Sequence, residues 1–420
     1  MNEQQGSGPV EQGFDRSRRS FLGGALGAAA SGPLLAAVTA LATPDGAAGA
    51  QPDRKIKLGL VGCGGRGSWL GGLFKKDGGY EIRAVADYFQ EVADRCGNDL
   101  GVARGRRFSG LSGYKRVLES GVEAVALEVP PYFFPEMAAA AVEAGVHVYM
   151  AKPVAVDVPG CLRIEAAARQ ATRKRQAFFV DYQIPTDPSN VEVVRRIHGP
   201  ATGKLAKIVT VCASSGYDDP PKTATLESRL RNSVWTRDIA LGGDWILAYD
   251  IHAIDAALWA AGRRPVAATG VSRVCRSRPH GDARDVCEVL YEYADGLVHT
   301  HTAQSLSNGA DTELSCYVYG ETAHALIAYW QKAFFRRRGE KGYASEVVDL
   351  YTAGAVRNIA SFRQAVVGGQ FDNPTVGRAV DGCLTCILGR EAAARHRRLT
   401  MEELLKENKR LEADLTGLRA

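Results

Sequence analysis

The fold of this chain is decided by one short stretch, Lys57-Leu58-Gly59-Leu60-Val61-Gly62-Cys63-Gly64-Gly65-Arg66-Gly67. Its first half is an apolar run typical of a strand, and a helical pattern of apolar residues follows the glycines. In this position Gly62 permits a tight turn, Gly64 lets the backbone approach a pyrophosphate, and Gly67 lets helix and strand pack closely. The helix N-terminus turns free N–H groups toward the phosphates. The stretch therefore predicts a dinucleotide-binding turn that includes Gly65 and Arg66.

The next predicted strand, residues 82–86, ends at Asp87, about 20 residues beyond Gly67. A carboxylate at this point accepts hydrogen bonds from the adenosine ribose hydroxyls and repels a 2′-phosphate, so NAD is favoured over NADP. Arg66 is the contrary signal, because its side chain is long enough to reach a phosphate. The alternative interpretation is that Arg66 lies in solvent.

The order of the predicted elements indicates two domains, as expected for 420 residues. Between residues 51 and 184, strands at 124–127, 146–150 and 178–180 alternate with helices at 135–144 and 159–173. This alternation predicts an NAD(P)-binding Rossmann domain with a parallel sheet. Between 185 and 400, one long helix at about 243–261 interrupts strands at 204–213, 266–273, 285–292, 297–304, 312–319 and 323–328. That pattern predicts an α+β domain, an open and mainly antiparallel sheet flanked by helices, and residues 401–420 are expected to form a C-terminal helix.

The first 50 residues have the pattern of a twin-arginine signal peptide. Ser17-Arg18-Arg19-Ser20-Phe21-Leu22 begins an apolar segment that runs to Ala42, and Ala48-Gly49-Ala50 is typical of a cleavage site. A membrane anchor is the alternative, because a span needs about 20 residues. The Gly and Ala content and the cleavage site favour removal, so we expect a periplasmic or secreted protein without membrane association. Because such passengers cross the membrane folded, a tightly held cofactor is expected.

Composition and cysteine spacing narrow the function further. The chain has 52 Lys and Arg against 47 Asp and Glu, a net charge of +5 without a basic cluster, which argues against nucleic-acid binding. Nine cysteines are scattered along the sequence, and the tight pair Cys383 and Cys386 lacks the second pair or histidine of a zinc site. We therefore expect buried thiols and no metal.

Three further motifs, together with the glycine turn, resemble the glucose–fructose oxidoreductase / inositol dehydrogenase / MocA (GFO/IDH/MocA) family. They are Ala151-Lys152-Pro153, Tyr182-Gln183 and the segment from Gly242 to Asp255 that contains His252. The resemblance runs from about residue 57 to 400 and is strongest to the secreted, twin-arginine branch. It implies a Rossmann domain plus an open-sheet domain, a small carbohydrate-like substrate, and a homodimer or homotetramer paired through the sheet.

The resemblance also implies roles for individual residues. Oxidising a secondary alcohol sends a hydride to nicotinamide and the hydroxyl proton to a base. Lys152 would polarise the substrate oxygen and transfer the proton, and His252 would act as base or substrate ligand. The other residues that it assigns are Pro130 and Gln183 near the cofactor, and Tyr249, Asp250 and Asp255 near the substrate, with Asp255 either orienting His252 or capping a neighbouring element.

The sequence departs from the family on the substrate side. Ala151 replaces the glutamate of the usual Glu-Lys-Pro, Ala248 replaces an acid one helical turn before His252, and residues 184–186 lack the usual basic residues. Three hypotheses therefore stay open: an NAD-dependent oxidoreductase of sugars, polyols or glycosides, an NAD-recycling glycosidase, and a non-catalytic nucleotide-binding assembly protein.

Three more histidines and one run of arginines have simpler interpretations. His299 and His301 alternate on a predicted strand and share one sheet face, where they would line the substrate site, line a subunit contact or be satisfied within the sheet. His147 lies within a Rossmann strand and is interpreted as structural. The run Arg336-Arg337-Arg338 is expected to be a solvated loop.

Overall fold

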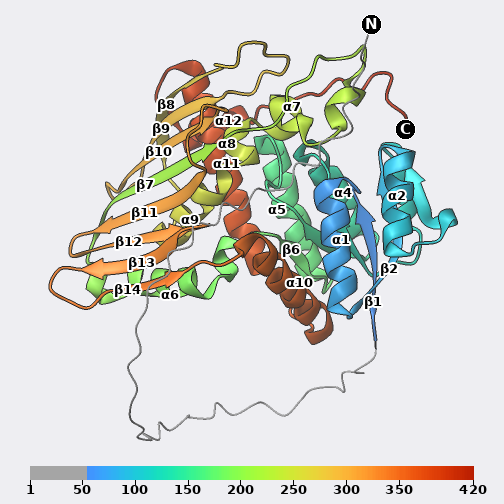
Figure 1. Ribbon diagram of the computed structural model, residues 1–420, viewed down its shortest axis with the longest axis horizontal. Coiled ribbons are helices and arrows are strands. Elements are labelled where there is room, and N and C mark those ends of the chain that lie inside the picture. Colours follow the sequence, from blue (N-terminus) through green and yellow to red (C-terminus); the bar gives the residue numbers. More distant parts are fainter. Residues whose placement is uncertain (1–53) are drawn as a thin grey trace, which may run out of the picture. The chain divides into compact units, whose positions relative to one another are not determined.

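A computed structural model describes residues 54–420 (Figure 1). The predicted signal peptide lies outside these residues. Among the helices of residues 54–420, none has the length and apolarity of a membrane span.

The first half contains a six-stranded parallel sheet in the order β3-β2-β1-β4-β5-β6. Its inner strands are almost continuously apolar because helices cover both faces, and β4 is buried at every position. The strands are β1 (Ile56–Val61), β2 (Tyr80–Asp87), β3 (Arg107–Ser109), β4 (Ala124–Leu127), β5 (His147–Met150) and β6 (Phe178–Val180). The helices are α1 (Gly65–Asp77), α2 (Gln90–Leu100), α3 (Gly113–Leu118), α4 (Phe134–Glu143) and α5 (Val158–Arg173). The predicted Rossmann domain is confirmed.

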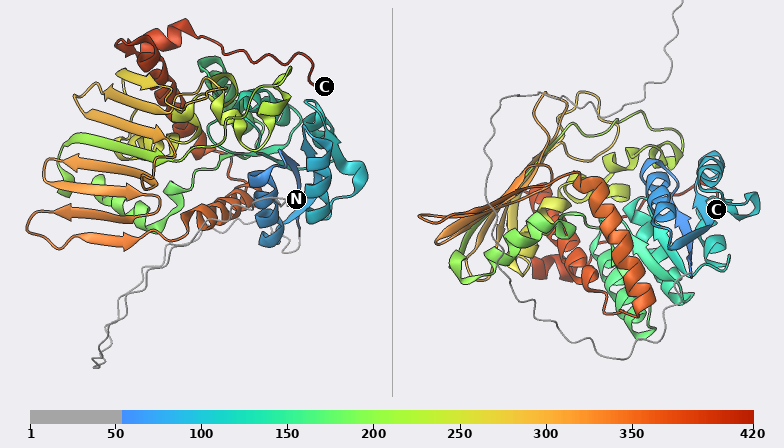
Figure 2. Two further views of the ribbon diagram at one scale, coloured as in Figure 1. Left: turned by 45° about the horizontal axis from the view of Figure 1, so that its top comes forward. Right: turned by 60° about the horizontal axis from the view of Figure 1, so that its bottom comes forward.

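The second half is built on a nine-stranded sheet in the order β14-β13-β12-β11-β7-β10-β9-β8-β15. Of its strand pairs in the described part of the chain, β7 and β10 are parallel and the rest antiparallel. Helices α6, α9 and α11 lie against one face of the sheet (Figure 2). Strands such as β10 alternate buried and more exposed residues, as expected for a sheet covered on one face. The strands are β7 (Leu205–Ser214), β8 (Ala267–Arg273), β9 (Val286–Glu292), β10 (Val298–Ser305), β11 (Glu313–Gly320), β12 (Ala323–Ala328), β13 (Lys332–Arg337), β14 (Tyr343–Glu346) and β15 (Leu399–Thr400).

The helices of the second half are α6 (Pro188–Ile197), α7 (Ile239–Gly242), α8 (Trp245–Ala248), α9 (Ile251–Ala261), α10 (Leu350–Gly368), α11 (Pro374–Arg395) and α12 (Met401–Glu407). Short 3₁₀ turns lie at Arg104–Arg106, Pro131–Phe133, Ile184–Thr186, Pro200–Thr202, Leu226–Leu230 and Val234–Arg237. Helix α10 returns to the Rossmann domain, where Ile359 and Phe362 join the apolar cluster of Leu58 and Phe74. The predicted boundary at residue 184 therefore does not separate two independent cores.

Three predicted elements are wrong. The helix at 243–261 is broken, because Tyr249 has a non-helical backbone (φ −124°, ψ −54°) between α8 and α9. The C-terminal helix ends at Glu407, where Asn408 adopts a left-handed conformation and caps it, and residues 408–420 continue without a helix. Arg336 and Arg337 belong to strand β13 rather than to a loop, because Ala333 and Phe335 alternate with them into the core.

Candidate active site

The glycine turn has the geometry that the sequence predicts. Gly62 has φ +93°, and a Cβ atom there would meet the backbone oxygen of Glu128 at 2.2 Å. A Cβ on Gly67 would lie 1.8 Å from the carbonyl oxygen of Gly62, so only glycine allows α1 to start this close to β1. Gly64 and Gly65 are exposed, and a Cβ on either would meet nothing within 4 Å. Helix α1 begins without a side-chain cap or an acidic residue in its first turn, so its first N–H groups are free for an anion.

Asp87 lies beside this turn at the end of β2. One carboxylate oxygen accepts a hydrogen bond from the N–H of Cys63 at 2.8 Å, and the other accepts one from the N–H of Phe89 at 3.0 Å. Burial raises the pKa of Asp87, and these two N–H donors counteract that rise. The two bonds fix the carboxylate at the edge of the glycine turn. The residues present therefore fit a dinucleotide, with a cradle for the phosphates and an acid for the ribose.

Arg66 pairs with two buried acids and keeps only part of its side chain in solvent, so the alternative of a freely solvated arginine is not what the structure has. Its Nε lies 3.1 Å from a carboxylate oxygen of Glu128, and its Nη2 pairs with Asp181. The guanidinium also lies over the rings of Trp69 and Tyr351, at 5.6 and 5.5 Å from their centres. Because β1 separates β2 from β4 in the sheet, Arg66 is directed away from Asp87. In this arrangement the guanidinium of Arg66 pairs with Glu128 and Asp181 and does not point toward the carboxylate beside which a 2′-phosphate would lie.

Glu128 and Asp181 are acids that the sequence interpretation missed. Each directly follows a buried strand, β4 or β6, and each side chain is nearly inaccessible. Asn358 of α10 donates a second hydrogen bond to Asp181. The rule that singled out Asp87 and Lys152, a polar residue immediately after an apolar run, would have found both acids.

Lys152 follows β5 at the same edge of the sheet, and its Nζ donates a hydrogen bond of 2.8 Å to the carbonyl oxygen of Ala248. Burial and the charge of Arg66 lower the pKa of Lys152 to about 8, while Asp181, Glu128 and Asp250 raise it. The carbonyl oxygen of Ala248 thus accepts the hydrogen bond from Lys152 at the position where the family places an acidic side chain. A lysine poised near neutral pH is suited to proton transfer.

His252 is the second residue of α9 and is 8% exposed. Its ring lies edge-on to Tyr182 and Tyr329, at centroid distances of 6.2 and 5.5 Å, and no protein group bonds its Nδ1. Burial, with help from Lys152 and Arg66, lowers the pKa of His252 well below 6.5. The imidazole is therefore neutral at neutral pH and has one ring nitrogen available.

The break between α8 and α9 turns Asp250 toward the sheet. Its carboxylate lies 3.2 Å from Nε2 of His301, and Thr210 bonds both His301 and His299 at 3.0 and 2.8 Å. Burial raises the pKa of Asp250 and lowers that of His299 to about 3. The two histidines do share one face of the sheet. In the hydrogen-bonded chain Asp250–His301–Thr210–His299, only one carboxylate oxygen of Asp250 and Nδ1 of His299 have no hydrogen-bond partner in the protein.

Asp255 is not the residue that orients His252. It is fully buried and pairs with Arg378 of α11 at 2.7 Å, while Nδ1 of His252 has no partner. The structure instead supports the alternative interpretation, in which Asp255 links α9 to the neighbouring helix α11. His147 is structural as predicted, because its Nδ1 accepts the N–H of Ala177 at 2.9 Å.

The remaining predicted residues occupy varied surroundings. Pro130 directly precedes the 3₁₀ turn after β4, and the ring of Tyr249 stacks on that of Trp245 with 5.3 Å between the ring centres. Gln183 is buried against Gly354 of α10, and its side-chain oxygen has no hydrogen-bond partner. Cys383 and Cys386 are buried on α11 as free thiols.

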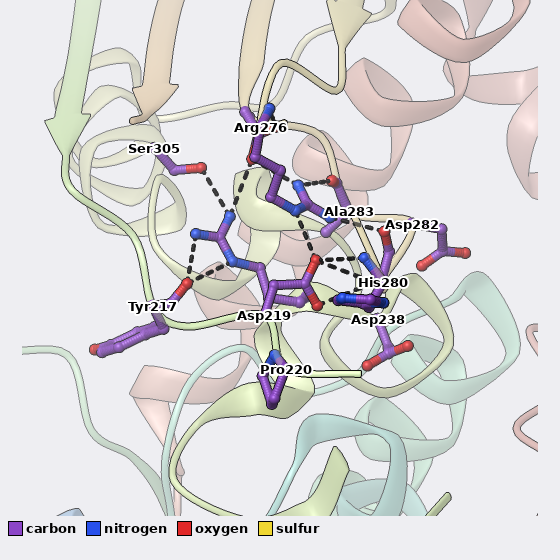
Figure 3. A network of polar contacts seen from close by, with 12 residues as sticks. Tyr217, Asp219, Pro220, Asp238, Arg276, His280, Asp282, Ala283 and Ser305 are labelled. Carbon is purple, nitrogen blue, oxygen red and sulfur yellow. Dashed lines mark hydrogen bonds and ion pairs between the residues drawn. The ribbon is translucent and has the colours of Figure 1, made fainter. Parts of the chain in front are cut away.

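One loop of the second half and the C-terminal tail reach the Asp87 corner, which here means Asp87 and the residues Tyr88 and Phe89 that follow it. The loop after β7 ends in a network of three arginines and three aspartates, in which Arg276 bonds Asp219 (Figure 3). The fully buried Arg229 bonds Asp219 and Asp238 in the same network. From this anchor Arg231 reaches the ring of Phe89, with its guanidinium carbon 3.5 Å from the ring centre.

The C-terminal tail, residues 408–420, reaches the same corner (Figure 1). The N–H of Arg419 bonds the hydroxyl of Tyr88 at 3.2 Å, and its carbonyl accepts the N–H of Leu111 at 3.0 Å. Tail and loop therefore both cover the residues that follow Asp87.

Comparison with known proteins agrees with this geometry. The family model for an oxidoreductase family with an NAD-binding Rossmann fold matches residues 56–180, and the model for the GFO/IDH/MocA C-terminal domain matches residues 200–326. Inositol 2-dehydrogenase 4 of Saccharopolyspora erythraea is 28% identical over 177 residues, which are 40% of this chain and 48% of that protein. The match thus spans about half of the length of that curated relative.

Solved structures share the fold at low identity. A levoglucosan dehydrogenase in complex with NADH and levoglucosan superposes with a TM-score of 0.69 at 16% identity, covering 83% of this chain and 100% of that one. An aldose-aldose oxidoreductase from Caulobacter crescentus, complexed with glycerol, has a TM-score of 0.67 at 18% identity and the same coverage. With both domain models matched in order, the chain belongs to the GFO/IDH/MocA family, and its first half is an NAD-binding Rossmann domain.

Proposed function

We propose that this protein is an NAD-dependent oxidoreductase that oxidises or reduces a sugar, polyol or glycoside. One observation carries the proposal: a lysine with a pKa of about 8 lies at the edge of the sheet that holds the glycine cradle, with a neutral histidine close by. When bound, NAD supplies the hydride acceptor. The matched relatives named as dehydrogenases of inositol and levoglucosan support the class of substrate.

The protein's own residues divide the proton chemistry. With a pKa of about 8, roughly a tenth of Lys152 is unprotonated at pH 7 and able to accept the hydroxyl proton of a substrate. His252 is too weak a base for this step, because its pKa lies well below 6.5. Its free ring nitrogen instead orients the substrate hydroxyl.

The test combines a nucleotide assay with a substrate panel. Purified protein is examined for bound NAD by its ultraviolet absorbance, and sugars, polyols and glycosides are screened for NADH formation. Oxidation should become faster as pH rises through about 8, since unprotonated Lys152 is required. Lys152→Met should lower the rate about 10² to 10⁴-fold while leaving NAD affinity within a few-fold. If the panel gives no hydride transfer and the variant behaves like the wild type, the proposal fails.

A second candidate is an NAD-recycling glycosidase of the same fold. The tail and loop that cover the corner after Asp87 favour it, because a retained nucleotide suits a reaction without net redox change. In that reaction the sugar is oxidised at C3, loses a C2 proton and its aglycone, takes up water and is reduced again. Release of an aglycone without net NADH, with solvent deuterium entering C2, would select this candidate.

The alternative of a non-catalytic nucleotide-binding assembly protein rests on Ala151 and Ala248. It predicts tight NAD binding without exchange of label between cofactor and any sugar. The hydrogen bond from Lys152 to the carbonyl of Ala248 weighs against it, because the lysine is held in place without an acid at 248.

We also propose export by the twin-arginine route and assembly through the open sheet face. Residues 17–22 and 48–50 support export, and replacing Arg18 and Arg19 by lysine should retain the protein in the cytoplasm. Val271, Leu290 and Val298 on three neighbouring strands are 41–55% exposed, which supports a homodimer or homotetramer. Light scattering that finds a monomer would contradict the assembly.

A further inference from the structure

Strand register places a buried carboxylate beside the position from which the family's glutamate is missing. In the parallel pair of β4 and β5, Leu127 is the partner of Met150, and the N–H of Ala151 bonds the carbonyl of Leu127 at 3.1 Å. Glu128, one residue further on, therefore lies next to Ala151. The absent acid at 151 is matched by an acid on the neighbouring strand.

The surroundings of Glu128 tie it to the turn and to the site. The carbonyl group of Glu128 lies where a side chain on Gly62 would be. A Cβ atom added to Gly67 would lie 3.4 Å from the Cβ atom of Glu128. One carboxylate oxygen pairs with Arg66, and the other is buried without any hydrogen-bond partner. An unpartnered oxygen in such a place is costly unless a ligand or a proton uses it.

We propose that Glu128 is a positioning residue that holds Arg66 inward and balances the positive charge of Lys152, taking over from the neighbouring strand the task of the missing acid at position 151. This assignment rests on the proposed function, since it gives Lys152 a catalytic purpose. Glu128 touches no reacting atom and acts through Arg66 and Lys152.

The charge balance explains why an acid is needed there. Arg66 and Lys152 place two positive charges in a partly buried region, where each lowers the pKa of the nearby His252. Burial raises the pKa of Glu128 to about 7. The carboxyl group is therefore mostly protonated below about pH 7 and mostly anionic above it. The charged or titratable groups around Lys152 are Arg66 from α1, Glu128 after β4, Asp181 after β6, Asp250 and His252 at the start of α9, and the Cys383 thiol of α11.

The test measures the titration of Lys152 directly, without turnover. The protein is labelled with acetic anhydride over a range of pH, and the modification of Lys152 is followed by peptide mass spectrometry. Glu128→Gln keeps the side-chain shape but removes the charge, so the midpoint for Lys152 should fall. A fall of about one pH unit would raise its labelling at pH 7 about fivefold. The matched control is Glu123→Gln, at the opposite end of β4, which should leave the midpoint unchanged.

Folding of each variant is checked by thermal melting. If Glu128→Gln does not fold, Glu128→Asp takes its place, and its withdrawn carboxylate should shift the midpoint in the same direction by less. An unchanged midpoint in the variant measured, or an equal shift in the Glu123 control, overturns the proposal. Because labelling requires no substrate, a shifted midpoint in a protein that oxidises nothing would refute the proposed function alone.

Discussion

Alanine substitutions along the glycine turn separate packing of the protein from binding of the nucleotide. Gly64 is exposed, its backbone (φ −65°, ψ −169°) is open to alanine, and an added Cβ would meet nothing within 4 Å. Gly64 is the N-cap of α1, where alanine is less favourable than glycine, and this loss opposes the gain from a less flexible unfolded chain, so Gly64→Ala should change the free energy of unfolding by less than about 1 kcal/mol. NAD affinity should fall at least about tenfold, or ~1.4 kcal/mol, because the methyl group occupies the path by which the pyrophosphate approaches the backbone.

Two other glycines of the same helix provide the controls. A Cβ on Gly67 would lie 1.8 Å from the oxygen of Gly62, so Gly67→Ala should cost about 3 kcal/mol or more of stability together with NAD binding. Gly72 is exposed with nothing within 4 Å of an added Cβ, so Gly72→Ala should stabilise by up to about 1 kcal/mol and leave binding unchanged.

The assays are urea unfolding for stability and calorimetric titration of nucleotide-free protein with NAD for affinity. The decisive comparison is between the change in the free energy of unfolding and the change in NAD affinity in each of the three variants. Wild-type affinity in a fully folded Gly64→Ala protein would show that the phosphates do not lie against this turn, and the placement of the nucleotide would have to be abandoned.

Three further outcomes are expected. Asp87→Ser removes the acid that disfavours a 2′-phosphate, so the NAD to NADP affinity ratio should fall about tenfold or more, and an unchanged ratio in binding titrations would show that Asp87 does not contact the ribose. Deleting residues 409–420 should speed release of bound nucleotide in a stopped-flow chase, with retention at the wild-type rate as the contrary result. His299 binds a proton below about pH 6.5 in the unfolded chain, but its pKa in the folded protein is about 3. The free energy of unfolding of the wild type, relative to His299→Gln, should therefore fall as the pH drops below about 6.5, by up to ~1.4 kcal/mol per pH unit. A difference that does not depend on pH would contradict the burial of that ring.

Much of the nucleotide site follows from local sequence rules. The glycine turn, Asp87 and Lys152 each lie at or just after the end of an apolar strand, and parallel strands end at one edge of a sheet. Glu128 and Asp181 follow the same rule, so the sequence alone would have been enough to predict that both lie at this edge of the sheet. What the rule does not reveal is their pairing with Arg66, because that depends on β4 and β6 both lying on the side of β1 opposite to β2.

The failures have local physical causes. Leu404, Leu411 and Leu415 have roughly helical spacing, yet only Leu404 is fully buried. Beyond Asn408 the half-buried positions 411, 413 and 415 alternate with exposed ones, which is the period of an extended chain. The break before α9 was also hidden, because an apolar run such as residues 245–248 fits a continuous helix and a broken one equally well.

The tail also fixes an order of events during biosynthesis. Arg419 and Tyr88 are separated by 331 positions, so the corner that follows Asp87 stays open on the ribosome until nearly all of the chain shown has been made. Nucleotide bound earlier would be held by the Rossmann domain alone and would exchange freely. On the prediction that the tail slows nucleotide release, slow exchange is a property of the completed fold and begins only when this last segment docks.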